Sequence, residues 1–173
     1  EDFTKEIDGE KVVYHKVEIY VRNYEYFRTA IVGNTLVGGM NHASGTPYLA
    51  RKKDAITAIN GDYCSGHNIG PVVRNGVLYR TSAFDDIFVM YTDGSMKAYE
   101  KGTYADMNFE SGDIWQAWSF GPSLLTADGQ PKTEFNSVLT DLHPRTAIGY
   151  YEPGHYCFVT IDGRNSGGSR GMT

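Results

Sequence analysis

The polar residues most able to do chemistry gather near the C-terminal end of the sequence. An apolar segment delivers Asp162 and Arg164 into a stretch with glycine at positions 163, 167, 168 and 171. Backbone N–H groups in a loop this rich in glycine can approach an anion closely and form a nest that holds phosphate. Arg145, Arg164 and Arg170 would add charge-assisted, bidentate hydrogen bonds to the same anion. A mobile surface loop flanked by structural ion pairs is the alternative, and composition alone favours neither.

A second polar cluster lies in the segment 58–64, which reads AINGDYC. Asn60 and Asp62 are two residues apart, so both side chains leave an extended strand on the same side and could reach one polar site. The alternative is an Asx turn, in which such a side chain stabilises its own backbone. For this segment taken alone, the turn is the favoured interpretation.

The glycine-rich stretch matches neither of two familiar motifs, the nucleophile elbow and the phosphate loop, once the residues around it are considered. Residues 167–171 read GGSRG and formally match G-x-S-x-G, the nucleophile elbow of α/β-hydrolases. That elbow places its serine at a tight turn directly after a strand, whereas Ser169 stands eight positions beyond Ile161, where the apolar segment ends. The acid and the histidine should also follow the serine, yet the sequence ends at Thr173. The glycine run equally lacks the Gly-Lys-Ser/Thr ending of a phosphate loop, and neither HExxH nor an EF-hand spacing occurs.

The length, charge and hydropathy of the sequence exclude several classes of protein. A chain of 173 residues suits one domain with a proper core, and we assign residues 1–173 to that domain. The net charge of −5 comes with dispersed basic residues, which argues against a nucleic-acid partner. No apolar run approaches the roughly 20 residues that a membrane helix needs. Cys64 and Cys157 allow one internal bridge and show no metal-type spacing, so cysteine usage does not settle the compartment.

The chain reads as strands and hairpins with little helix, which predicts an α+β domain built on a strand-rich mixed sheet. Period-two alternation runs from Val13 to Val21, with the odd positions facing one way. Hairpins are predicted at 72–79 around Asn75-Gly76, at 87–99 around 92–94, and at 146–161 around 152–155. The run 156–161 (YCFVTI) is nearly continuous in apolar character, so we expect a central strand buried on both faces.

One short helix is predicted between these strands. Thr46 would cap it, Pro47 would take its first position, and it would run to Lys53. The segment from Asp54 to Asn60 then reads as a strand that leads into a loop containing glycine. No internal repeat or linker-like stretch interrupts the chain.

Five segments, in order between residues 58 and 173, together resemble the phosphodiester glycosidase family. AINGDYC at 58–64 is similar to the family's A-x-N-G/A-x-F segment. GPVV at 70–73 with Asn75-Gly76 is similar to its G-x-V-x-x-G hairpin, and FGPSLLTADGQ at 120–130 to its G-P-x-L-x-x-x-G segment. HPRTAIG at 143–149 and VTIDGRNSGGSRGMT at 159–173 are the most specific pieces.

The resemblance implies an enzyme that hydrolyses the anomeric C–O bond of sugar-1-phosphodiesters, with N-acetylglucosamine-type or envelope-glycan substrates. A phosphate monoester would leave, so stabilising its charge matters more than a general acid. Asp162 is the favoured carboxylate, as base for water or stabiliser of oxocarbenium-like charge, and Asp62 is the second candidate. Either carboxylate could instead hold a metal ion or an arginine. The remaining implied roles are catalysis for Arg145 and substrate binding for Asn60, Arg164, Gly167, Gly168, Ser169 and Gly171.

Two departures from the family pattern stand out. Cys64 occupies a position where the family usually has an aromatic residue, and the family continues beyond G-M-T into a helix and a strand that ends in a D-G-G-G-S-like motif. We therefore expect a domain that is incomplete at its C-terminus and that a further fragment or a second chain would complete. No cofactor follows from the resemblance, although a divalent cation is compatible with the carboxylates. The resemblance also implies a secreted protein of the extracellular space or the cell envelope.

Two rival hypotheses use the same residues. A non-catalytic binding module for phosphate-linked glycans would keep the pocket without turnover. A purely structural envelope domain would carry a disordered glycine-rich tail. Order in residues 163–173, with arginines converging on one pocket, would count against the second rival.

Overall fold

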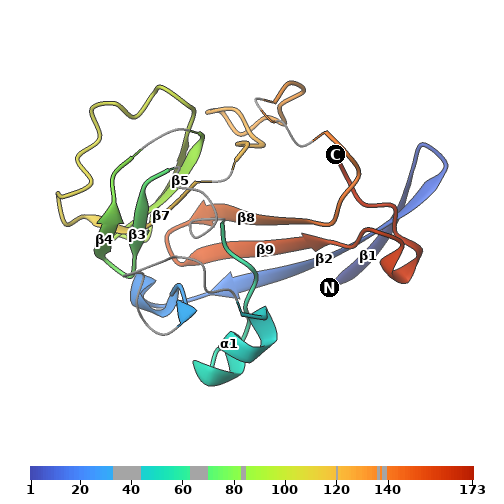
Figure 1. Ribbon diagram of the computed structural model, residues 1–173, viewed down its shortest axis with the longest axis horizontal. Helices are drawn as coiled ribbons and strands as arrows, with labels where there is room; N and C mark the ends of the chain where they lie inside the picture. The colour runs from blue at the N-terminus through green and yellow to red at the C-terminus, as the bar shows by residue number, and fades with distance from the viewer. Residues whose placement is uncertain (33–43, 63–69, 83–84, 120, 136, 138–139) are drawn as a thin grey trace. The chain divides into compact units, whose positions relative to one another are not determined.

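The structure, a computed structural model, describes residues 1–32, 44–62, 70–82, 85–119, 121–135, 137 and 140–173. These residues form two compact units (Figure 1). The first, which we call the terminal unit, combines Glu1–Arg22 with Ser137–Thr173. The second, the central unit, spans Asn23–Asn136. Each unit is built on an antiparallel sheet of its own.

The sheet of the terminal unit joins the two ends of the sequence. Its strands are β1 (Asp2–Ile7), β2 (Glu10–Tyr20), β8 (Arg145–Glu152) and β9 (His155–Ile161), in the spatial order β1-β2-β9-β8. Figure 1 shows the blue strands β1 and β2 beside the red strands β8 and β9. The first hairpin of the chain therefore pairs directly with the last one.

The prediction that residues 156–161 form a central strand is confirmed, because β9 lies between β2 and β8. Its consecutive residues Tyr156 and Cys157 point to opposite faces, and they are only 0% and 7% exposed. The other residues of β9 are partly exposed, so burial on both faces is limited to this pair. On β2 the buried residue is Val12, at 1% exposed, whereas Val17 of the predicted alternating pattern is 40% exposed.

Cys157 is a buried free thiol that packs against a glycine. Gly149 of β8 lies opposite Cys157, and a Cβ added at Gly149 would lie 2.5 Å from the Cys157 Sγ. The absence of a side chain at Gly149 therefore makes room for the sulfur. Cys64 lies outside the described residues.

The central unit is built on a sheet with the order β4-β3-β7-β5-β6. Its strands are β3 (Val72–Arg74), β4 (Val77–Arg80), β5 (Ile87–Tyr91), β6 (Met96–Tyr99) and β7 (Ile114–Ser119). Every residue of the middle strand β7 is buried. The hydrophobic core around it comprises Val73, Ile87, Val89, Tyr104, Ile114 and Ala117.

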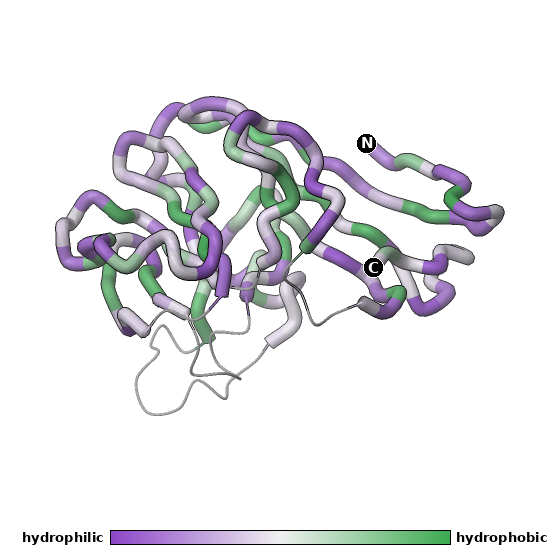
Figure 2. The backbone as a smooth tube through the Cα atoms, turned by 90° about the horizontal axis from the view of Figure 1, so that it is seen from above, coloured by the Kyte–Doolittle hydropathy of each residue, from purple (hydrophilic) through white to green (hydrophobic). Residues whose placement is uncertain are grey.

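The three predicted hairpins are present as β3–β4, β5–β6 and β8–β9. Asn75 and Gly76 have φ angles of 52° and 77°, the two positive values that a type I′ turn requires. Gly94 and Gly154 supply positive φ in the other two turns. Figure 2 shows short hydrophobic stretches that alternate with hydrophilic ones along the backbone.

The predicted helix is present but begins differently. The helix α1 spans Thr46–Lys52, and its N-cap is Gly45 rather than Thr46. Thr46 is already helical, so its hydroxyl cannot take the capping position, and no side chain caps this helix. Pro47 is therefore the second helical residue rather than the predicted first, and it is tolerated there because its missing N–H is not needed in the first turn.

The strand predicted from Asp54 to Asn60 is wrong. This segment forms turns and irregular backbone, with Asp54 at a φ of 51° and Ile56 fully exposed. Its apolar residues are compatible with a strand, but a strand forms only where a neighbour satisfies its backbone hydrogen bonds. The described strands pair with one another elsewhere.

The predicted strand-rich α+β fold with hairpins and few helices is confirmed. The described residues contain α1 and the short 3-10 helices η1 (Tyr24–Tyr26) and η3 (Ser166–Gly168). Every pairing within the two sheets is antiparallel, whereas the sequence predicts a mixed sheet. Four of these pairings are hairpins, whose consecutive strands run in opposite directions. In the described part of the chain, no helix has the length and apolar character needed to cross a membrane.

Replacing Gly149 with alanine should destabilise the terminal unit. The added methyl group would meet the Cys157 sulfur at 2.5 Å, and overpacking of this kind costs about 1–3 kcal/mol. Cys157→Ala removes the sulfur, so the double variant should regain part of the loss. Denaturant unfolding of the four proteins measures this coupling, and strict additivity would show that the two strands do not meet in this register.

Candidate functional site

Asp162 begins the glycine-rich loop where β9 ends, and contacts at three points hold it. Its N–H donates to the Val13 carbonyl at 2.9 Å, and its carbonyl accepts from the Ser169 hydroxyl at 2.7 Å. Its carboxylate Oδ2 lies 3.5 Å from Nε2 of His15. The side chain is 34% exposed. The favoured carboxylate is therefore held through both its backbone and its side chain while it still reaches solvent.

Ser169 ties the loop to β2 from the inside. It is 0% exposed, and its hydroxyl donates to the Asp162 carbonyl and accepts from the Val13 N–H at 3.0 Å. A hydroxyl carries one donor hydrogen, and the Asp162 carbonyl takes it. These contacts give Ser169 a structural task, and its substrate-binding role stays a prediction.

The backbone of this loop is tightly curved. Arg164, Asn165, Gly167 and Gly168 have φ angles of 54°, 63°, 57° and 75°. Glycine adopts such angles freely, whereas at Arg164 and Asn165 they carry strain of the kind that clusters at functional sites. Within the loop, backbone N–H groups donate to loop carbonyls from residues 165, 166, 168 and 169. The predicted anion nest would have to use other N–H groups.

Arg145 stands at the start of β8 with its guanidinium bound to backbone. Nε donates to the Met172 carbonyl at 2.9 Å, and Nη2 donates to the Asp141 carbonyl at 2.8 Å. The register pairs Arg145 with Ile161, and Asp162 is one residue further along. Since consecutive residues face opposite sides, Arg145 and Asp162 leave the sheet on opposite faces. The structure does not bring these two predicted catalytic residues onto one face.

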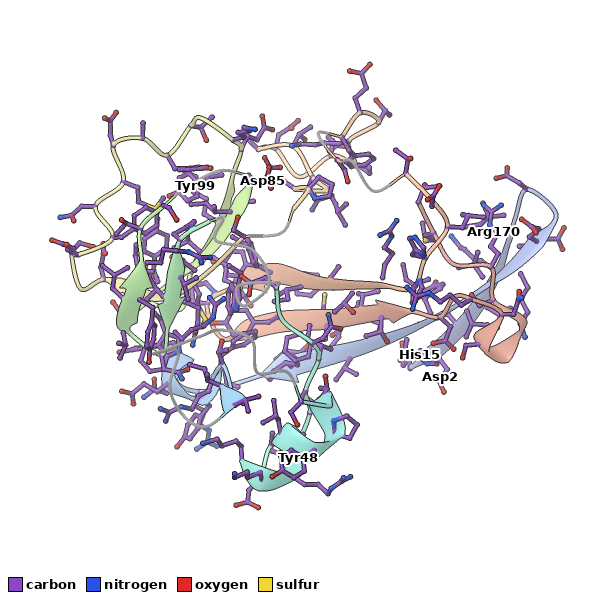
Figure 3. The ribbon with its side chains drawn as sticks, viewed as in Figure 1. Asp2, His15, Tyr48, Asp85, Tyr99 and Arg170 are labelled. Carbon is purple, nitrogen blue, oxygen red and sulfur yellow. The ribbon has the colours of Figure 1, made fainter. Side chains whose placement is uncertain are left out.

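The two arginines of the glycine-rich loop, Arg164 and Arg170, do not point to a common site either. Arg170 forms ion pairs with Asp8 at 3.1 Å and Glu10 at 3.0 Å, at the turn between β1 and β2 (Figure 3). Arg164 is exposed. The loop is therefore ordered by its contacts, but its arginines do not converge on one pocket. Arg170 therefore forms structural ion pairs, which was the alternative to anion binding. For Arg164, substrate binding stays a prediction.

Gly163 and Gly171 allow two backbone segments to touch. His143 and Met172 exchange two backbone hydrogen bonds of 3.0 Å. A Cβ added at Gly163 would lie 2.6 Å from the Pro144 nitrogen, and one at Gly171 would lie 2.6 Å from the His143 carbonyl oxygen. Both glycines therefore have a packing reason to be glycine. The predicted role of Gly171 in binding substrate is not needed to explain it.

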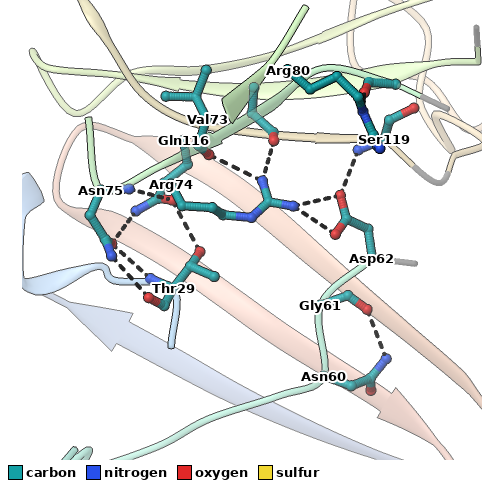
Figure 4. Close-up of polar contacts among 12 residues, drawn as sticks. Thr29, Asn60, Gly61, Asp62, Val73, Arg74, Asn75, Arg80, Gln116 and Ser119 are labelled. Carbon is teal, nitrogen blue, oxygen red and sulfur yellow. Dashed lines mark hydrogen bonds and ion pairs between the residues drawn. The ribbon is translucent and has the colours of Figure 1, made fainter. Parts of the chain in front are cut away.

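In the central unit an arginine binds Asp62. Both carboxylate oxygens accept from Nη2 of Arg74, at 2.7 and 2.9 Å, and Oδ2 also accepts from the Ser119 N–H at 2.9 Å (Figure 4). The side chains of Arg74 and Asp62 are 1% and 6% exposed. Nη1 of Arg74 donates to the carbonyls of Val73 and Ala117. Of the alternatives open to Asp62, the structure shows the one with an arginine, and its catalytic role stays a prediction.

Asn60 does not share this contact. Its exposed side chain donates from Nδ2 to the Gly61 carbonyl at 3.3 Å, while Asp62 is turned towards Arg74 (Figure 4). The less favoured interpretation of this segment, with both side chains on one side of a strand, is therefore not observed, and the two side chains have different partners.

A buried amide network beside Arg74 has no clear signal in the sequence. Gln116 of β7 is 0% exposed, and its Nε2 donates to Oδ1 of Asn75 at 2.8 Å. Its Oε1 accepts from the Thr29 hydroxyl at 3.0 Å and from the Asn75 N–H at 3.1 Å (Figure 4). The network fixes the Asn75-Gly76 turn against the middle strand. A glutamine inside the apolar run IWQAWS is the one hint of it.

His15 and Asp2 are the residues near the site that sequence reasoning missed. Nδ1 of His15 lies 2.7 Å from Oδ1 of Asp2 (Figure 3). This hydrogen bond raises the pKa of His15 and lowers the pKa of Asp2. The sequence places His15 on an alternating strand, but only the pairing of the chain's two ends brings it to Asp162.

The described residues contain no group of three or more His, Cys, Asp or Glu side chains that could hold a metal ion. A cleft of about 260 Å³ occurs in the central unit, where it includes Pro122 and Ser123 of the GPSL segment. Gly121 packs against Asp86 there, since an added Cβ would lie 2.8 Å from the Asp86 Cβ. None of the predicted site residues lines the cleft, whose lining is Asp86, Glu100, Lys101, Pro122, Ser123, Lys132, Glu134 and Phe135.

Comparison with protein families matches residues 53–173 to phosphodiester glycosidase. The chain therefore belongs to the phosphodiester glycosidase family. It is also similar in fold to a solved structure of the zebrafish N-acetylglucosamine-1-phosphodiester alpha-N-acetylglucosaminidase catalytic domain, auto-inhibited by pro-peptide, with a TM-score of 0.51 and 14% sequence identity. That match covers 94% of this chain and 59% of the zebrafish chain. No curated protein matches the sequence.

Replacing Ser169 with alanine should destabilise the terminal unit. The change leaves the Val13 N–H and the Asp162 carbonyl without their buried hydroxyl partner, which costs about 1–3 kcal/mol. Ser166→Ala in the exposed part of the same loop is the matched control and should change stability little. Denaturant unfolding compares the two variants, and equal stabilities would contradict the anchoring role of Ser169.

Asp62→Ala should unfold the central unit more easily, because it leaves the Arg74 guanidinium buried without its counter-charge. Removing one partner of a buried ion pair costs about 3–5 kcal/mol. The double variant Asp62→Ala/Arg74→Met should recover much of the loss, since no buried charge remains. Thermal and denaturant unfolding provide the measurement. If the single variant is as stable as the wild type, the ion pair does not hold this unit together.

Proposed function

We propose that this chain is part of a hydrolase that cleaves the anomeric C–O bond of sugar-1-phosphodiesters. The observation that supports this most directly is Asp162, a partly exposed carboxylate held at the start of a glycine-rich loop within the family-matched residues 53–173. We propose N-acetylglucosamine-type or envelope-glycan phosphodiesters as substrates. The name of the zebrafish protein of similar fold supports the first of these two classes.

In the proposed reaction, water attacks the anomeric carbon. Asp162 accepts a proton from the water, the bond from carbon to the bridging oxygen breaks, and its electron pair leaves with the phosphate monoester. That leaving group is a stable anion, so the reaction depends less on a general acid than ordinary glycoside hydrolysis does. Arg164 is exposed, and its guanidinium suits the binding of this anion, whereas Arg145 leaves the sheet on the face opposite to Asp162.

The proposal rests on Asp162 rather than on Asp62. Both oxygens of Asp62 are bound by Arg74, and one of them also accepts from Ser119. Accepting a proton at Asp62 would break a buried ion pair, which is costly. Asp162 has no such commitment to an arginine among its contacts with Val13, Ser169 and His15.

A non-catalytic binding module for phosphate-linked glycans is the second candidate. Most glycosidases use two carboxylates, and the engagement of Asp62 by Arg74 leaves Asp162 as the one predicted carboxylate outside an arginine pair. The chain also spans 59% of the zebrafish chain that it resembles, so residues beyond this span can carry part of the activity. For both candidates we propose an extracellular or cell-envelope location, and a further segment or second chain that completes the domain.

Hydrolysis of UDP-N-acetylglucosamine in oxygen-18 water tests the proposed reaction. Cleavage of the anomeric C–O bond should place the label in the free sugar, as followed by mass spectrometry. Asp162→Asn should lower the rate by roughly 100-fold to 10,000-fold if the carboxylate acts as the base. Asp106→Asn, which changes an exposed carboxylate of the central unit, is the matched control and should leave the rate unchanged.

The position of the label separates the alternatives. Label in the phosphate would mean attack at phosphorus and would contradict the proposed mechanism. Binding of the substrate by calorimetry without any turnover would favour the binding module. The absence of both binding and turnover would contradict both candidates for this substrate.

A further inference from the structure

Three titratable side chains form a row across one face of the terminal unit's sheet. His15 stands in the middle, with Nδ1 2.7 Å from Oδ1 of Asp2 and Nε2 3.5 Å from Oδ2 of Asp162. Figure 3 shows His15 and Asp2 side by side, where the start of β1 lies against the middle of β2. A protonated imidazole has a donor N–H on each ring nitrogen, so it can face both carboxylates at once.

These three side chains lie close together because of the register of their strands. Asp2 pairs with His15, and His15 pairs with Thr160 of β9, so all three share one face. Asp162 is two residues beyond Thr160 and returns to that face. The row is therefore a consequence of the ladder that joins β1, β2 and β9.

The two carboxylates are the charged groups that face His15. On β8 the same row continues with Thr146, which carries no charge. The α-amino group of Glu1 lies at the end of β1 and is bonded to the Lys16 carbonyl at 2.8 Å. The electrostatic partners of His15 are Asp2 and Asp162.

Val13 and Ser169 hold the backbone of Asp162, whereas the contact of its carboxylate is the one with His15. Val13 bonds its N–H, and Ser169 bonds its carbonyl. The side chain is short and partly exposed, so a charge of opposite sign beside it would restrict its rotation. His15 is the residue that supplies such a charge at this position.

We propose that His15 is a positioning residue for Asp162, and that Asp2 in turn orients His15. This rests on the proposed function, in which Asp162 acts on the water. A base must stay close to the atoms that react, because a displacement of about 1 Å can cost roughly 100-fold in rate. Asp2 and His15 lie outside the family-matched residues 53–173, so the N-terminal hairpin of this chain supplies the support.

The contact depends on pH through the imidazole. The hydrogen bond with Asp2, and after it the neighbouring Asp162, raise the pKa of His15 above its ordinary value of 6.5. The cation is therefore present at low pH and persists above 6.5, and it is lost as the pH rises through the raised pKa. We expect kcat to fall on that alkaline side, with little change in KM, because in this proposal the imidazole acts through the Asp162 carboxylate.

Steady-state kinetics on the full chain test the proposal through four variants. His15→Gln should lower kcat by roughly 10-fold to 100-fold, keep KM within about twofold, and abolish the alkaline fall of kcat. Asp2→Asn should keep kcat at low pH but move the alkaline fall to lower pH, because it removes the charge that raises the pKa of His15. His155→Gln, on the opposite face of the same sheet, is the control and should change neither kcat nor the profile. His15→Asn should match His15→Gln, since neither side chain is charged.

Nuclear magnetic resonance titration of the His15 ring gives a readout that does not need turnover. The pKa of His15 should fall in Asp162→Asn and in Asp2→Asn, relative to the wild type. An unchanged pKa in Asp162→Asn would overturn the proposal, as would a His15→Gln variant that is folded by thermal unfolding and keeps the wild-type kcat and pH profile. If the wild type shows no turnover, the proposed function fails on its own, while the titration still decides whether His15 holds Asp162.

Discussion

The pairing of β2 with β9 is the interaction on which the candidate site depends. It runs from Tyr14 opposite Ile161 to Tyr20 opposite His155, and it joins opposite ends of the sequence. Because of this pairing, Val13 bonds both Asp162 and Ser169, and β2 brings His15 to the carboxylate. Closing so long a loop costs conformational entropy that is repaid only when the ladder forms. The loop and the sheet must therefore form together, because the contacts of Asp162 exist only when β2 pairs with β9.

The central unit is held together on a different principle. Its middle strand is buried along its whole length, yet it carries Gln116 and lies beside the buried Arg74. The described polar groups around Arg74 and Gln116 have hydrogen-bond partners, from the Asp62 carboxylate to the Asn75 amide. Such groups contribute little net stability against an apolar core, but an arrangement that leaves any of them unpaired is strongly disfavoured. We infer that they select one register for the sheet. The AINGDYC segment of the family pattern contributes to this interior through Asp62.

The parts of the fold that could be predicted from the sequence are those with a local cause. The Asn75-Gly76 turn was predictable because two adjacent residues must have positive φ, and few residue types allow this. The family resemblance was predictable from glycines such as Gly163 and Gly171, whose positions are set by close backbone approach. The false strand at 54–60 could not be excluded, because a strand needs a partner and its own residues do not reveal one. The burial of Ser169, the orientation of Arg145 and the contact of His15 with Asp162 all depend on a register between distant strands. No local pattern encodes that register.

The N-terminal hairpin supplies two of the four strands of the terminal unit's sheet, so a fragment without it would lack half of that sheet. The family signature begins at residue 53, after β1 and β2 have ended. A fragment that starts there would keep β8 and β9 but leave one side of β9, with its apolar sequence HYCFVTI, as an unpaired edge. Exposed apolar edges recruit other strands, so such a fragment should associate with copies of itself or aggregate. The region that matches the family is thus smaller than the region that pairs both sides of β9.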